Sequence, residues 1–111
     1  MNRPTRFYSN AQEKKVAKVV NGKQTANSGA TKFVKGDVHT DEFLIECKTS
    51  TTAKSSFTIK REWISKNKEE AFAMGKPYST VCFDFGDGSD RFYVIDEKLF
   101  LKLINYLKED I

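Results

Sequence analysis

The spacing of apolar residues predicts regular elements in the first third of the chain. Residues 10–20 have helical spacing, and Ser9 and Gln12 are placed as a capping box at the start of that helix. Residues 23–31 are polar and predict a loop. A short strand is expected over 33–38, where β-branched and aromatic residues follow the loop.

The remaining two thirds alternate between strand and helix signals. Residues 42–48 alternate apolar and polar positions, which is typical of a half-buried strand. A helix is predicted over 59–74, because Gly75 and Pro77 follow it as stop signals. Strands over 81–85 and 91–95 are joined by a Gly-Asp-Gly-Ser hairpin signal.

The last helix is expected to begin at Asp96, a good N-cap residue. Its apolar residues recur at spacings of three and four and form a stripe: Leu99, Phe100, Leu103, Ile104 and Leu107. The order helix, strand, strand, helix, strand, strand, helix predicts an α/β (α+β) domain with a mixed central sheet flanked by helices. Four alternating aromatics are expected in the sheet core: Phe83, Phe85, Phe92 and Tyr93.

Length and composition narrow the class of protein. A chain of 111 residues is one domain, and 39% hydrophobic residues are enough for a core, which excludes disorder over the whole chain. No run approaches the length of a membrane span, and no apolar segment follows the N-terminus, so we expect an intracellular protein with residues 1–8 as a flexible basic arm. Cys47 and Cys82 lie in strand-like runs and are expected to be buried free thiols.

Positive charge is concentrated in the first third of the chain. Residues 1–35 hold eight Lys and Arg against one Glu, a net charge of +7, whereas the rest of the chain has a net charge of −3. Such a segment suits a polyanion, and nucleic acid is the first candidate. The alternative is a solvated lysine-rich surface without a partner.

The strand over 42–48 carries two charges where an apolar residue is expected. Glu46 and Lys48 share a face with Leu44, because side chains two residues apart leave a strand on the same side. If the two strands pair antiparallel through the turn at Thr40, Asp37 lies nearly opposite Glu46. Two close carboxylates repel unless a proton or a cation lies between them, and oxygen ligands favour Mg²⁺ or Mn²⁺.

Glu13 is a third candidate carboxylate. It lies within the apolar stripe of the first helix, since Val16, Ala17 and Val20 follow it at spacings of three, four and seven. A charge on that face needs a metal or a basic partner, and the alternative is a residue at the edge of the stripe that reaches solvent. If the strand continues to His39, this residue shares a face with Asp37 and is a ligand, a proton relay or a surface residue.

These motifs resemble the PD-(D/E)XK nuclease superfamily. The signature is carried by Gly36-Asp37, eight intervening residues and Glu46-Cys47-Lys48, with Gly36 in place of the proline. The order of Glu13, the loop Asn27-Ser28-Gly29-Ala30 and the two strand motifs is similar to that of archaeal and phage Holliday junction resolvases. The Thr-rich stretch followed by residues 57–63 also resembles that group, and the likeness spans roughly residues 6–107.

The resemblance implies a restriction-endonuclease-like fold and a metal-dependent endonuclease of branched double-stranded DNA that acts as a homodimer. Asp37 and Glu46 would bind Mg²⁺ or Mn²⁺ with the Cys47 backbone carbonyl, Glu13 would complete the site, and Lys48 would position the attacking water. DNA contacts would come from Lys14, Lys15, Lys18, Ser28, Gly29, Lys60 and Arg61. Trp63 is expected in the core or at a dimer contact. The alternatives are a nuclease of the same fold acting on flaps, ends or damaged DNA, and a non-catalytic DNA-binding protein.

Overall fold

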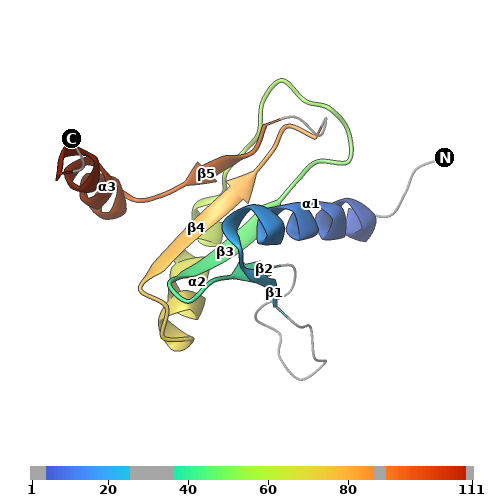
Figure 1. Cartoon of the computed structure of the whole chain (residues 1–111). Coiled ribbons are helices and arrows are strands. Elements are labelled where there is room, and N and C mark those ends of the chain that lie inside the picture. The colour runs from blue at the N-terminus through green and yellow to red at the C-terminus, as the bar shows by residue number, and fades with distance from the viewer. Residues whose placement is uncertain (1–4, 26–36, 87–89, 110–111) are drawn as a thin grey trace.

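The computed structural model describes residues 5–25, 37–86 and 90–109. Eight elements follow one another in these ranges (Figure 1). They are α1 (Thr5–Val20), β1 (Lys23–Gln24), β2 (Asp37–His39), β3 (Phe43–Lys48), α2 (Arg61–Ala73), β4 (Tyr78–Phe83), β5 (Phe92–Val94) and α3 (Glu97–Glu109).

The strands form one five-stranded mixed sheet in the order β1-β2-β3-β4-β5. β3 and β4 are parallel and are connected through α2, whereas the other neighbouring strands are antiparallel. The predicted mixed α+β class is confirmed, and the sheet has one strand more than the sequence suggested. The additional strand is β1, which pairs with β2. It lies at the start of residues 23–31, the segment predicted to be a polar loop.

The two faces of the sheet are covered by different helices. α1 packs on one face, over β1, β2 and β3, and α2 packs on the other, over β3 and β4 (Figure 1). One cluster of buried apolar residues lies between α1 and the sheet and consists of Val16, Val38, Ile45, Cys47 and Cys82. Leu44, Ala71 and Val81 are buried as well. Both cysteines are buried free thiols, as predicted.

α2 is fixed to the sheet by a buried amide. Asn67 Nδ2 donates hydrogen bonds to the Leu44 carbonyl at 3.2 Å and to the Thr80 carbonyl at 3.0 Å, one on each of the two parallel strands. The helix ends where predicted, because Gly75 adopts a φ of +73°, a conformation that glycine takes without strain. This anchor sets the position of α2 above β3, where the charged residues lie.

Two predictions about the N-terminal segment are wrong. α1 begins at Thr5, so Ser9 lies inside the helix and does not cap it, and residues 5–8 belong to the helix and not to a flexible arm. The capping pattern at Ser9 does not determine where α1 begins, because a local capping signal contributes less stability than the packing of the whole helix. Residues 26–36, which include most of the predicted loop and strand, lie outside the described residues.

The aromatic residues near the hairpin form a partly exposed cluster and not a sheet core. Phe57, Phe83, Phe85 and Phe92 lie with ring centroids 5.1–5.8 Å apart. Phe92 is 46% exposed and Tyr93 is also exposed, because none of the described helices packs extensively on β5. The aromatic residues alternate as predicted, but they are not fully buried, because no described helix covers this part of the sheet.

The last helix also differs in its packing. Asp96 caps α3 as predicted, with its Oδ1 accepting from the Leu99 amide at 2.9 Å. The apolar stripe is present, yet none of the residues of α3 is buried. Within the described ranges, no helix has the length and apolarity needed to cross a membrane.

Candidate active site

Two carboxylates meet on neighbouring strands. In the antiparallel pair of β2 and β3, Asp37 is the direct partner of Glu46, as the sequence predicted. Direct partners share a sheet face, and their Cβ atoms lie about 4.5–5.5 Å apart. The two acids therefore project from the same face, side by side.

Asp37 is the most strongly perturbed acid of the site. Its side chain is 2% exposed, and among the described residues Oδ1 has no hydrogen-bond partner. Burial, followed by the charges of Glu46, Glu70 and Glu13, raises the pKa of Asp37 to about 8, against the opposing charge of Lys48. A buried, unpaired carboxylate among like charges is the environment that a cation would relieve.

Glu13 faces inward from α1. It is 7% exposed, and Gln24 Nε2 donates to its Oε1 at 3.3 Å. Burial raises the pKa of Glu13, and the hydrogen bond from Gln24 partly opposes that shift. The prediction that Glu13 belongs to the apolar stripe is confirmed, and the solvent-exposed alternative is excluded.

Lys48 is held between an acid and an aromatic ring. Its Nζ lies 3.2 Å from Glu46 Oε2 and 4.5 Å from the centroid of the Trp63 ring. Trp63 is half-buried at the start of α2 and not part of the core, so its indole covers the lysine. A cation over an indole face is stabilised by the ring quadrupole, which fixes the ammonium group beside the carboxylates.

Sequence reasoning missed the residue that joins α1 to this strand end. Gln12 is buried, and its Nε2 donates to the Lys48 carbonyl at 2.7 Å and to Asp84 Oδ2 at 3.1 Å. The other oxygen of Asp84 accepts from the Thr49 hydroxyl at 2.6 Å. The sequence pattern around Gln12 was interpreted as a capping box with Ser9, whereas the Gln12 side chain joins α1 to the end of β3.

Glu70 was also missed. It is buried on α2, and its charge is among those that raise the pKa of Asp37. Burial raises the pKa of Glu70 itself, and Lys66 opposes the shift. The available signal was helical spacing, since Asn67, Glu70 and Ala71 recur at three and four residues and form the buried face of α2.

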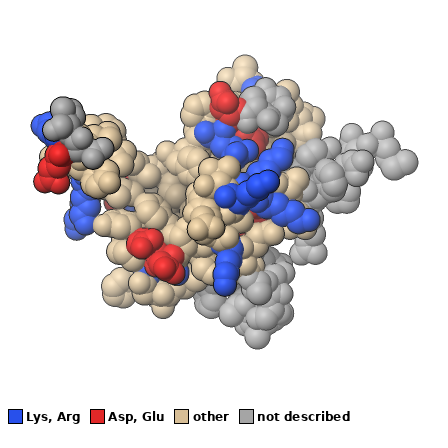
Figure 2. Space-filling model, in the orientation of Figure 1, with Lys and Arg blue, Asp and Glu red and all other residues tan. Residues whose placement is uncertain are grey.

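The predicted DNA-contacting residues are placed at the surface where they are described. Lys14, Lys15 and Lys18 are exposed on α1, and Figure 2 shows Lys and Arg side chains gathered over that helix. Lys60 and Arg61 are exposed at the start of α2. Ser28 and Gly29 lie outside the described residues.

Two further candidates have side chains directed elsewhere. The Cys47 thiol lies in the core with Val38 and Ile45, on the face opposite Glu46 and Lys48, so any role in the site belongs to its carbonyl. His39 Nδ1 lies 3.0 Å from the Thr25 hydroxyl. Burial, then the charges of Lys76 and Lys23, lowers the pKa of His39.

The donor set suits a hard cation held partly by water. As placed, no three His, Cys, Asp or Glu side chains of the described residues converge closely enough to hold a metal ion by themselves. Mg²⁺ is commonly bound by one or two carboxylates and several waters, so the opposed pair of Asp37 and Glu46 fits it. The unpartnered Asp37 Oδ1 fits that interpretation as well.

Comparison with known proteins yields no relative. No family model matches the chain, and neither the curated proteins nor the solved structures contain a significant match. The function must therefore be argued from the fold and from the geometry of the site.

Proposed function

We propose that this protein is a metal-dependent endonuclease of the PD-(D/E)XK type. The observation that carries the proposal is the direct pairing of Asp37 with Glu46, with Lys48 two residues further on the same face. Glu13, buried on α1, adds a third carboxylate close enough to raise the pKa of Asp37. This combination of acids and one lysine at a strand end suits phosphodiester hydrolysis.

Asp37 and Glu46 would hold Mg²⁺ or Mn²⁺, with Glu13 and the Cys47 carbonyl as further oxygen donors. When bound, such a cation stabilises the charge that develops on the phosphate and lowers the pKa of a water molecule. The burial of Asp37 keeps bulk water away from one side of the site. Metal binding would also remove the like-charge repulsion that the folded chain bears among these carboxylates.

Lys48 would orient the attacking water and stabilise the negative charge that forms. Its Nζ is 3.2 Å from Glu46 and is covered by Trp63, so few orientations are open to it. A positioned ammonium group costs little reorganisation during the reaction, which is the basis of electrostatic catalysis. Gln12 supports this role by holding the Lys48 carbonyl, and it acts as a positioning residue.

The lysines of α1 would bind the DNA backbone. Lys14, Lys15 and Lys18 are exposed on α1, the helix that carries Glu13. Lys60 and Arg61 would contact phosphates from the α2 side. Phosphate contacts give affinity and position but no sequence information.

The substrate we propose is a branched duplex, in particular a four-way junction resolved in recombination. This part of the proposal follows from the resemblance to Holliday junction resolvases, and it requires a homodimer. Two symmetric nicks across a junction need two active sites related by a two-fold axis, and one chain of 111 residues provides one such site.

The deciding experiment compares four DNA substrates at equal concentration: a four-way junction, a flap, a nicked duplex and a linear duplex. We expect paired nicks in the junction with Mg²⁺ and none with EDTA. Faster cleavage of flaps or ends would assign the same site to another nuclease role. Junction binding without cleavage in Mg²⁺ or Mn²⁺ would contradict nuclease activity and favour a DNA-binding protein.

Affinity for DNA should fall steeply with salt, because phosphate neutralisation releases counterions. Replacing Lys14, Lys15 and Lys18 together by Ala should weaken binding to junction and linear duplex about equally. The slope of log affinity against log salt should flatten by up to about three units, about 0.9 for each lost phosphate contact. Fluorescence anisotropy over a salt series measures both quantities.

A triple Ala variant of Lys66, Lys98 and Lys108 is the matched control, since these exposed lysines carry the same charge on α2 and α3. It should keep the wild-type slope. If the α1 variant loses its preference for the junction but keeps its affinity for duplex, α1 reads junction shape, and selectivity does not come from the spacing of two active sites.

A further inference from the structure

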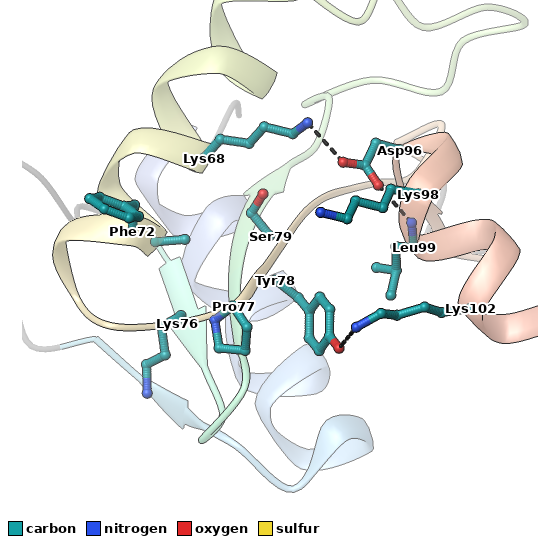
Figure 3. A pocket seen from close by; sticks show the side chains of 11 residues that line it. Lys68, Phe72, Lys76, Pro77, Tyr78, Ser79, Asp96, Lys98, Leu99 and Lys102 are labelled. Carbon is teal, nitrogen blue, oxygen red and sulfur yellow. Dashed lines mark hydrogen bonds and ion pairs between the residues drawn. The ribbon is translucent and has the colours of Figure 1, made fainter. Parts of the chain in front are cut away.

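A cleft between α2 and α3 carries more positive than negative side chains. It has a volume of about 510 Å³, and three lysines extend into it: Lys68 from α2, and Lys98 and Lys102 from α3 (Figure 3). Among the described residues that line it, Asp96 is the one acid. Sites for small molecules commonly have volumes of about 300–1,000 Å³, so the cleft has the size of a ligand site.

The carboxylate of Asp96 balances only one of these lysines. Its Oδ2 lies 2.8 Å from Lys68 Nζ, and its Oδ1 accepts from the Leu99 amide at 2.9 Å. These two hydrogen bonds, that from Lys68 first, lower the pKa of Asp96, so the group is ionised at neutral pH. In the described part of the chain, no carboxylate lies within ion-pair distance of Lys98 or Lys102.

The charge of the cleft matches that of a terminal phosphate group. A fourth lysine, Lys76, borders the cleft, but its Nζ donates to the Thr40 carbonyl at 2.6 Å and points away from α3 (Figure 3). Three ammonium groups and one carboxylate remain, a net charge of +2. A phosphomonoester carries about −1.5 to −2 at pH 7, whereas each phosphodiester of a nucleic acid carries a single negative charge.

Hydrogen-bond donors come from both sides of the cleft. An ammonium group has three N–H donors, and Lys68 and Lys102 each use one of them within the protein. The Tyr78 hydroxyl accepts from Lys102 Nζ at 2.9 Å, which leaves its own O–H for another acceptor. The Ser79 hydroxyl lines the same space (Figure 3). An anion with several oxygens would accept from α2, α3 and β4 together, in charge-assisted hydrogen bonds.

The cleft also has an apolar wall. Pro77, Leu99 and the ring of Tyr78 are part of its lining. The Tyr78 ring packs against that of Phe43 with centroids 5.2 Å apart, which holds it in place. A few polar groups beside an apolar and aromatic wall are typical of sites for organic ligands, so the cleft fits a phosphate ester better than phosphate alone.

We propose that the cleft between α2 and α3 binds a small phosphomonoester, with a nucleoside monophosphate as the class that fits both the lysines and the apolar wall. A free nucleotide and the 5′-phosphate at a DNA end both supply this chemistry. A duplex is too wide to enter a cleft of this volume, so the duplex contacts proposed for α1 are unaffected.

The cleft is distinct from the carboxylate site. Tyr78 pairs with Phe43 at the start of β3, whereas Lys48 lies five residues further along that strand. At about 3.3 Å per residue, the two positions are about 17 Å apart. The inference therefore goes beyond the proposed nuclease function and does not depend on it.

The test is isothermal titration calorimetry of the full chain in metal-free buffer with adenosine 5′-monophosphate (AMP), adenosine and inorganic phosphate. We expect one AMP per chain with a dissociation constant below about 1 mM. Adenosine should bind at least about 10-fold more weakly, because it lacks the charge-assisted hydrogen bonds. Inorganic phosphate should also bind at least about 10-fold more weakly, because it makes no contact with the apolar wall.

Lys98→Glu replaces a cation of the cleft by an anion and should weaken AMP binding at least about 10-fold. Lys98 is exposed, and the variant keeps the contacts of Lys68 and Lys102 that attach α3, so it should keep the wild-type melting temperature. Lys108→Glu is the matched control, because Lys108 is exposed on the same helix and does not line the cleft. It should bind AMP like the wild type. Lys102→Gln repeats the test if Lys98→Glu unfolds.

A single-stranded oligonucleotide with a 5′-phosphate, compared with the same strand without it, separates the two sources. Tighter binding of the phosphorylated strand that Lys98→Glu abolishes assigns the cleft to DNA ends, and equal binding of the two strands assigns it to free nucleotides. The proposal is overturned if AMP does not bind at concentrations up to about 10 mM, or if it binds no more tightly than adenosine or inorganic phosphate. A folded Lys98→Glu variant with wild-type affinity for AMP overturns it as well.

Discussion

The Asp37→Asn variant is expected to lose DNA cleavage and to gain stability in the absence of metal. Removing one of two opposed carboxylates should lower the cleavage rate at least about 1,000-fold, since a bound cation supplies several kcal/mol of transition-state stabilisation. DNA binding should remain intact or become tighter, because Asp37 is not among the residues proposed to contact phosphates and the variant adds no negative charge. Single-turnover cleavage and a binding assay in Ca²⁺ separate the two effects.

The gain in stability should depend on pH in a defined direction. The pKa of Asp37 is about 8 in the folded protein and near 3.8 in an unfolded chain, so the folded state holds a proton that the unfolded chain releases. The stability that this proton gives is complete below about pH 4 and is lost as the pH rises to about 8. At pH 8, Asp37→Asn should exceed the wild type by on the order of 3 kcal/mol in metal-free buffer.

Asp41→Asn is the control for this comparison, because Asp41 is exposed in the turn between β2 and β3. It should leave cleavage and stability unchanged. Added Mg²⁺ should raise the melting temperature of the wild type and of Asp41→Asn but not that of Asp37→Asn. Equal stabilisation of all three by Mg²⁺ would show that the cation does not bind at Asp37.

The Lys48→Gln variant is expected to keep the metal and the DNA but to cleave about 100- to 1,000-fold more slowly. Gln keeps a polar side chain of similar reach, yet it carries no charge to orient the water or to stabilise the transition state. The contact at 3.2 Å with Glu46 is lost as well, which leaves that carboxylate free for the cation. Stabilisation by Mg²⁺, measured by thermal unfolding, should therefore persist or increase.

Lys98→Gln removes the same charge from α3 and should cleave at the wild-type rate. The variants are compared at saturating DNA, so that a difference in affinity does not enter the rate. If Lys48→Gln cleaves normally, the lysine is a structural partner of Glu46 and Trp63, and the water is positioned by another group.

The opposed carboxylates could be predicted because their geometry depends on short-range rules. Asp37 and Glu46 are separated by one tight turn, and the alternation of β3 fixes which residues share a face. The inward position of Glu13 follows from helical periodicity in the same way. In both cases, the order of residues within a short stretch of sequence determines which side chains share a face.

The residues that were missed depend on contacts between distant segments. Gln12 reaches Lys48 and Asp84, which are 36 and 72 residues away in the chain. Glu70 approaches the carboxylates only because Asn67 fixes α2 over β3 and β4. Helical spacing places Asn67, Glu70 and Ala71 on one face of α2, but no local pattern states at which position along the sheet that face packs.

The last strand and the last helix were predicted correctly as elements, but Phe92 and Tyr93 were wrongly expected in the core. Phe92 and Tyr93 alternate as strand residues should, and the stripe of α3 has the spacing of a buried helix. Whether a side chain is buried depends, however, on which element packs against it, and the spacing of apolar residues does not identify that element.

The position of Trp63 has a practical consequence. It is the single tryptophan of the chain, and its ring lies 4.5 Å from the Lys48 ammonium group and 5.8 Å from that of Lys60. Its fluorescence therefore originates at the edge of the carboxylate site and nowhere else in the protein. Titrations with cations or oligonucleotides can be followed through this native fluorophore, without a label and without a second tryptophan to subtract.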